Sequence, residues 1–204
     1  MIGASAKDEG QVLPLFVWAT GIILFVAFAF FAFAQAAVAR NSTQSAADAA
    51  ALAAAREARE DLVRDFLLAL SGDGDLDAYL SAAVQIAHPG MRQAAQQLAE
   101  ANQASVVGDV AVGSRDGYPD FAVTVRGDKG LAHSVVPGVE GRHATATATA
   151  GLMPLCELDG EAPESGETVT LRCRAGKSVV IDPAELEQGP FEQVNDLFAV
   201  RLIK

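Results

Sequence analysis

The amino-acid sequence predicts an α+β protein, in which a long N-terminal helix precedes a second helical segment and a small, mostly antiparallel β-sheet. Three observations lead to this prediction. The segment from Val12 to Ala34 is apolar throughout, the stretch that follows to Leu70 is rich in alanine, and the part after Ser105 alternates with a period of two. Helices first and strands afterwards are typical of an α+β arrangement.

The apolar run predicts a membrane-spanning helix over residues 12–34. It reads VLPLFVWATGIILFVAFAFFAFA, and no charged residue occurs between Gln11 and Ala39. A helix of about 20 apolar residues crosses the hydrocarbon core of a bilayer. A cleaved signal peptide is the alternative, but its apolar part has about 7–15 residues and follows a basic segment. The preceding MIGASAKDEG holds one lysine and two acids, so a retained span is favoured.

The helix is expected to continue past the membrane into a helical region, residues 35–104. Alanine, the best helix former, dominates the stretch up to Leu70. After the breaker sequence SGDGDLD, in which Asp75 is expected to cap the next helix, a second helix from Leu76 to Ala104 is predicted. An interruption is expected at His88-Pro89-Gly90, because proline disrupts helix interiors.

Residues 105–204 are predicted to be rich in β-strands. One strand is expected over residues 106–112 and another over 121–125, with GSRDGYPD as the hairpin loop between them. In RHATATATAG, small alanines alternate with histidine or threonine, so the alanine face could press against the alanine-rich helix. Further short strands are expected at Thr168–Cys173, Ser178–Ile181 and Leu197–Ile203.

The net charge of −11 lies entirely after Arg40, because Lys7 and Arg40 balance Asp8 and Glu9 up to that residue. An acidic ectodomain argues against nucleic acid as a partner, since nucleic acids select lysine and arginine patches. The lipid bilayer is a partner through the predicted span. The charges flanking the span do not decide its orientation, since Lys7 and Arg40 stand on opposite sides of it.

Cys156 and Cys173, the two cysteines of the chain, predict the topology. An even pair suggests a disulfide in an extracytoplasmic compartment, and two reduced, unrelated thiols are the alternative. The pair would close a loop of about 16 residues, which is worth about 3 kcal/mol in the chain-entropy model. We therefore place residues 1–11 in the cytoplasm and the domain after the span outside it.

The sequence holds no constellation that predicts catalysis, a cofactor or a metal. His88, His133 and His143 lack metal-ligand spacing. The acidic stretch that begins at Asp73 lacks the glycine and glutamate that a calcium loop of the EF type needs. AGKS at residues 175–178 lacks the earlier glycine of a phosphate-binding loop. We expect neither an enzyme nor a cofactor.

Asp8 and Glu9 stand directly before the apolar helix, at the predicted membrane boundary. Acids at a helix N-terminus interact favourably with the helix dipole, by about 0.3–1 kcal/mol. A second role is pairing with the terminal amine of a neighbouring subunit, because a charge near lipid is costly unless it is paired. This role would set the register of parallel helices.

Two segments resemble a known family. DEGQVLPLF before the span and ARNSTQSAADAAALAAARE after it resemble the TadE/TadG-like proteins of Tad (Flp) pilus systems, over about residues 8–59. The most specific part is QSAADAAALAAA. It holds the residues that are expected to pack helix against helix, which are Ala46, Ala47, Asp48, Ala49, Ala50 and Ala51. Alanine allows close backbone approach while it keeps the helix stable.

The resemblance implies a single-pass, pilin-like protein that serves as a minor subunit or assembly factor of a pilus. Its implied partners are other pilin-like subunits, the assembly machinery and a prepilin peptidase. In pilin relatives the peptidase cuts before the apolar segment and leaves an acid at the fifth position. A cut after Gly3 would place Asp8 there, and a cut after Ala4 would place Glu9 there.

Two other classes of function remain open from the sequence. One is a membrane-tethered extracytoplasmic binding module unrelated to filaments, and the other is an enzyme on the same anchor. The smooth helical continuation beyond the span favours the filament class, because a simple tether does not need a helix that runs unbroken out of the lipid.

Overall fold

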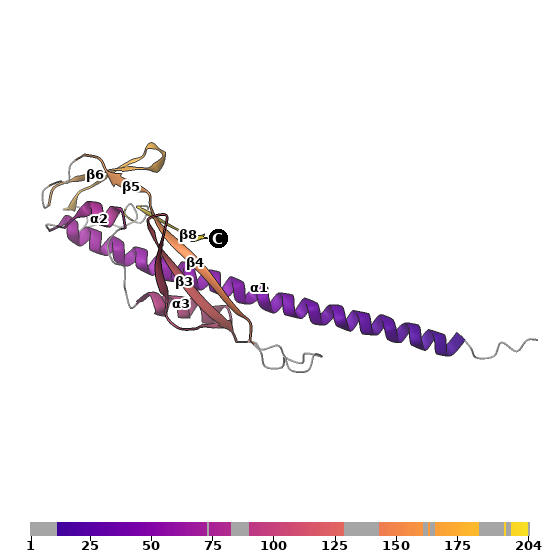
Figure 1. Ribbon diagram of the computed structural model, residues 1–204. Helices are drawn as coiled ribbons and strands as arrows, with labels where there is room; N and C mark the ends of the chain where they lie inside the picture. Colours follow the sequence, from indigo (N-terminus) through magenta and orange to yellow (C-terminus); the bar gives the residue numbers. More distant parts are fainter. Residues whose placement is uncertain are drawn as a thin grey trace, which may run out of the picture.

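The predicted α+β fold is confirmed, with a long helix followed by two antiparallel sheets. In Figure 1 the N-terminal part of the helix extends as a bare rod from a body that contains the rest of the described elements. The computed structural model describes residues 12–72, 74–82, 90–128, 143–160, 163, 166–183, 194 and 197–203.

Helix α1 runs without interruption from Val12 to Leu70, over 59 residues. Its side chains remain largely exposed as far as Ser42, and continuous burial begins with Thr43 and Ala46. The Thr43 hydroxyl donates a hydrogen bond of 2.9 Å to the carbonyl oxygen of Ala39, so this buried polar group is satisfied within the helix. One helix therefore has two distinct surroundings along its length.

The segment predicted as an interrupted second helix from Leu76 to Ala104 contains two helices, in agreement with the expected division into two pieces. Helix α2 spans Leu76–Leu80, and the Asp75 carboxylate caps it as expected by accepting a bond of 3.2 Å from the Ala78 amide. Helix α3 spans Gly90–Ala101 and packs against α1. The predicted interruption at His88-Pro89 lies outside the described residues.

The larger sheet has the order β1-β3-β4-β8, and β2 also pairs with β3. All of its pairings are antiparallel. Its strands are β1 Ala104–Val106, β2 Ala111–Arg115, β3 Tyr118–Gly127, β4 Thr145–Pro154 and β8 Phe198–Ile203.

The single strand predicted over residues 106–112 is wrong, because the chain forms two strands, β1 and β2, on the same side of β3. They are separated around Gly108, whose φ of +77° lies in the left-handed region that favours glycine. The predicted hairpin loop is also shorter than expected. Asp116 and Gly117, both with positive φ, form a two-residue turn that suits the twist of paired strands.

A second, three-stranded sheet has the order β5-β6-β7 and is drawn beside the C-terminal end of α1 in Figure 1. Its strands are β5 Cys156–Leu158, β6 Val169–Cys173 and β7 Ser178–Ile181, and a short 3-10 turn, η1 Arg174–Gly176, joins the last two. The strands predicted over residues 168–173, 178–181 and 197–203 are confirmed as β6, β7 and β8.

Small residues let the upper half of α1 lie close to the larger sheet. Ala50 on the helix and Ala150 on β4 are both fully buried in one core. A Cβ on Gly127 would lie only 2.8 Å from the Thr43 hydroxyl oxygen, so a larger residue would have to displace this hydroxyl where β3 passes the point at which α1 enters the body. The expected contact between the alanine face of β4 and the helix is confirmed.

The close approach of α1 to its neighbours predicts that Ala50→Leu destabilises the body. Extra methyl groups at this fully buried site would force the helix and its neighbours apart, and overpacking of this kind costs about 1–3 kcal/mol. Denaturant unfolding of the full chain in detergent, followed by circular dichroism, measures the loss. Ser45→Leu at an exposed position of the same helix is the control. Equal stability of the two variants would contradict the packing argument.

Candidate membrane anchor and assembly surface

The bare half of α1 is apolar and uncovered by the rest of the chain. Its large side chains point outward on all sides, and Trp18 and Phe33 are 73% and 77% exposed. An 18-residue window within the helix has a mean hydropathy of 2.5, and none of that window is buried. By length and composition, this helix is able to cross a membrane. A soluble protein rarely leaves so much contiguous apolar surface exposed.

A polar neck separates the apolar run from the body. Residues 35–42 are helical and belong to neither the apolar run nor the core, apart from the half-buried Ala39. At about 1.5 Å per residue, the neck holds the body about 12 Å from the end of the apolar run. Arg40, exposed in this neck, is the first charged residue of the described helix, and Asp48 is the next. One cation therefore marks the boundary between the two surroundings.

The acids and the cleavage site predicted before the span lie outside the described residues. These are Gly3, Ala4, Asp8 and Glu9.

The alanines of the QSAADAAALAAA segment are mostly covered by the chain itself. Ala46, Ala47, Ala50 and Ala51 have no exposed surface and belong to the core formed with the sheet and α3. The expectation that they pack directly on a sister helix does not fit this arrangement, because their surface is already occupied. Asp48 and Ala49 are half-exposed. The Asp48 carboxylate accepts a bond of 3.0 Å from the Gln44 amide, one turn before it.

A groove lies between α1 and α3, along the upper half of α1. Its volume is about 320 Å³. Apolar side chains form its lower end, and charged ones form its upper end. The lining residues are Ala49, Leu52, Ala53, Arg56, Glu57 and Glu60 of α1 and Leu98 of α3.

The groove could not be found from the sequence, because α1 and α3 are brought together by the sheet rather than by proximity along the chain. Gly90, the first residue of α3, helps to form this pairing. An ideal Cβ at this position would lie 2.6 Å from Oε1 of Glu57, so glycine gives the acid room beside the start of the helix. Leu52 and Ala49 on α1, which are half-exposed, are the signal in the sequence that could have suggested the groove.

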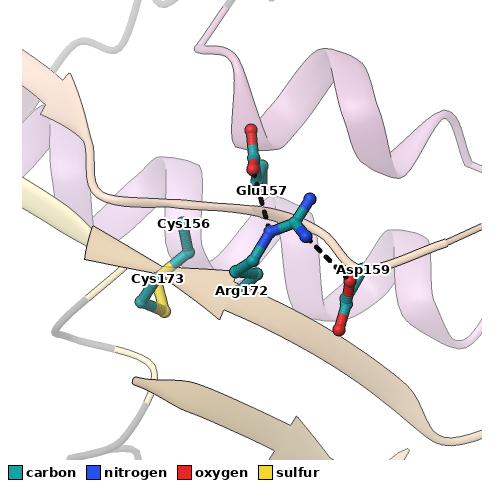
Figure 2. A network of polar contacts seen from close by, with 5 residues as sticks. All are labelled: Cys156, Glu157, Asp159, Arg172 and Cys173. Atoms are coloured by element: carbon teal, nitrogen blue, oxygen red, sulfur yellow. Dashed lines mark hydrogen bonds and ion pairs between the residues drawn. A yellow bond between two sulfur atoms is a disulfide. The ribbon is translucent and has the colours of Figure 1, made fainter. Parts of the chain in front are cut away.

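The predicted disulfide between Cys156 and Cys173 is present, and it joins residues that face each other on β5 and β6. Figure 2 shows Arg172 beside this bond, between two acids. Its Nε lies 3.2 Å from Oε1 of Glu157, and its Nη1 lies 3.5 Å from Oδ1 of Asp159. All three side chains are substantially exposed, so these pairs contribute little stability. The disulfide therefore connects β5 and β6 more strongly than these ion pairs do.

The loop closed by the disulfide also contacts the end of α1. The amide of Gly166 donates a bond of 3.2 Å to the carbonyl oxygen of Leu70, the last residue of the helix. Carbonyl groups in the last turn of a helix have no partner within the helix. The loop therefore supplies a bond that the helix cannot make for itself.

The described residues include no group of three or more His, Cys, Asp or Glu side chains that could hold a metal ion. His143 has a structural role, since its Nδ1 donates a hydrogen bond of 2.6 Å to the carbonyl oxygen of Gly127. His88 and His133, which lack metal-ligand spacing in the sequence, lie outside the described residues.

Comparison with protein families identifies one region of this chain. Residues 10–57 match the Flp pilus-assembly TadE/G-like family. The match covers the apolar run, the neck and the alanine-rich segment. Comparisons with curated proteins and with solved structures give no match. The sheets and the disulfide lie beyond the matched region.

The disulfide is predicted to contribute measurably to the free energy of unfolding. In the double variant Cys156→Ser, Cys173→Ser, the unfolded chain regains the freedom of a loop of about 16 residues, so the free energy of unfolding should fall by about 3 kcal/mol. Denaturant unfolding of the full chain measures the change. Arg172→Gln, which removes only the exposed ion pairs, is the matched control. A loss in the control as large as in the double variant would contradict this account.

Proposed function

We propose that this protein is a pilin-like, single-pass membrane protein that acts as a minor subunit or assembly factor of a Tad/Flp-type pilus. The observation that carries the proposal is the TadE/G-like pilus-assembly domain at residues 10–57. This domain coincides with the uncovered apolar half of α1 and with its entry into the body. The proposed partners are other pilin-like subunits and the pilus machinery in the membrane.

The continuity of α1 supports assembly over simple tethering. The same helix supplies the uncovered apolar segment and a large share of the core of the body. A flexible linker would suffice to hold a binding module at a membrane. A rigid helix instead fixes the orientation of the body relative to the apolar segment, as a subunit with a defined place in an assembly requires.

The proposed topology places the N-terminus in the cytoplasm and the body outside it. The disulfide supports this orientation, because disulfides persist in oxidising compartments and are rare in the cytosol. A cysteine introduced at exposed Val180 of β7, in a chain with both native cysteines changed to serine, should react with a membrane-impermeant maleimide on intact spheroplasts. Labelling only after the membrane is permeabilised would reverse the proposed orientation.

Cells that lack this protein provide the test of its role. We expect the surface pili recovered by shearing to be lost in the deletion strain and restored by the full chain. The sheared fraction of the restored strain should contain the protein if it is a subunit, and the membrane fraction alone should contain it if it is an assembly factor. Normal pili in the deletion strain would contradict the proposal and favour a tethered binding module.

The proposed processing has its own test in the mass of the N-terminus. A prepilin peptidase would leave a chain that begins at Ala4 or Ser5, after a cut that follows Gly3 or Ala4. Mass spectrometry of the native protein distinguishes these ends from an intact Met1. An intact end would exclude processing while leaving the role of an unprocessed assembly factor.

The acids before the span yield a further prediction. The double variant Asp8→Asn, Glu9→Gln should still insert into the membrane but should impair pilus assembly, because it removes the charges proposed to pair with a neighbouring amine. Sheared pili and carbonate-washed membranes measure the two properties separately. Asp48→Asn, an acid further along α1, serves as the comparison. Unimpaired assembly by the double variant would remove the pairing role.

A further inference from the structure

We propose that the groove between α1 and α3 receives the end of the apolar run and the neck of a second copy of this chain, with Phe33 of that copy in its apolar end and Arg40 of that copy at its acidic end. This inference rests on the proposed function, because it describes a contact between subunits of one assembly. It concerns a surface beyond the covered alanines, on the open side of the helix.

The groove has a polarity along α1. At its lower end, the small side chains of Ala49 and Ala53 leave a hollow between Leu52 and Leu98. At its upper end, Glu57 and Glu60 line the groove. An occupant that fits this surface therefore presents an apolar side chain first and a cation about two helical turns later, in the same direction as α1.

The bare part of α1 carries this pattern. Phe33 is the most exposed large hydrophobic residue of the described chain at 77%. Arg40 follows seven residues later and is also exposed. Seven residues make about two turns, so the two side chains lie on the same face of the helix. No other charged residue occurs on the described helix before Asp48.

The spacing between Phe33 and Arg40 on one copy also matches the spacing between the apolar end and the acidic end of the groove on the other. The apolar end of the groove is centred near Leu52, and its acids stand at positions 57 and 60. With Phe33 at the level of Leu52, Arg40 of a parallel neighbour reaches the level between the two acids. Arg56 is the cation on the groove, and the two acids outnumber it. Charge pairs of this kind give an interface its register.

This contact requires the two copies to be displaced along their axes. An offset of about 19 residues corresponds to about 28 Å at the rise of an α-helix. The hydrocarbon core of a bilayer is about 30 Å thick, so the copy that supplies its neck stands higher by nearly the whole core. Two copies at the same depth in one membrane cannot make this contact. It therefore belongs to a copy that has been drawn out of the lipid.

Disulfide trapping between two differently tagged chains tests the contact. One chain carries Phe33→Cys and the other carries Leu52→Cys, and both keep the native cysteines. We expect a mixed dimer, cleaved by reductant, in the sheared pilus fraction. The control replaces Phe33→Cys with Phe28→Cys, which is exposed on another face of the same helix, and should give no dimer. A mass spectrum of the linked peptides identifies the pair.

Charge reversal in the trapping chains tests the register. Arg40→Glu in the neck donor should lower the yield of mixed dimer about tenfold, which corresponds to about 1.4 kcal/mol. Glu60→Arg in the chain that supplies the groove should restore it when both changes are combined. Arg201→Glu, an exposed reversal on β8, should leave the yield unchanged. Loss without restoration would overturn the proposed pairing.

The outcomes separate this inference from the proposed function. If pili form without the protein, the proposed function fails. If pili require the protein and no 33–52 dimer forms in pili or membranes, the groove contact alone is overturned. If Phe33→Cys links instead to a different pilus protein, the second copy is the wrong occupant.

Discussion

The close approach of α1 to the larger sheet is the contact on which the rest of the structure depends. It is possible because the facing residues are small, with alanine on both the helix and β4 and glycine where β3 passes Thr43. Protein interiors are packed as densely as organic crystals, so each of these positions limits how near the backbones can lie. The larger sheet, α2 and α3 all pack against this one helix.

The same helix is bare in its lower half and packed in its upper half, and its composition changes accordingly. Below the neck, exposed phenylalanines alternate with alanines on every side, as suits a lipid environment. Above Thr43, alanines face the core and charged residues face outward. Helix propensity is high in both parts, so the backbone continues while the side chains change. This continuity makes the apolar segment and the body one mechanical unit.

Much of the fold could be predicted from the sequence because its signals are local. The apolar run, the alanine-rich continuation, the cysteine pair and the Asp75 cap each depend on a few neighbouring residues. The division of residues 106–112 into two strands was missed, because it depends on the left-handed backbone of Gly108 and on pairing with β3. Asp116-Gly117 is a local signal for a two-residue turn, and it favours a shorter hairpin loop than the predicted GSRDGYPD.

The candidate site was harder to predict for a related reason. Alanine allows close packing with any partner, so the AADAAALA segment alone could not distinguish a sister helix from the chain's own sheet. The structure assigns four of its alanines to the protein's own core. The groove that remains open also depends on α3, whose place beside α1 is a tertiary contact. Sequence periodicity describes one helix at a time, and the groove belongs to two.

The bond from Gly166 to the last carbonyl of α1 has a mechanical consequence. Among the described elements, α1 is the only one that continues from the body into the apolar rod (Figure 1). A pull on the body therefore reaches the rod as tension along a single helix, whose hydrogen bonds run parallel to the load. Fraying would start at an end, where the bonds are fewest. The disulfide-closed loop reinforces one of these two ends.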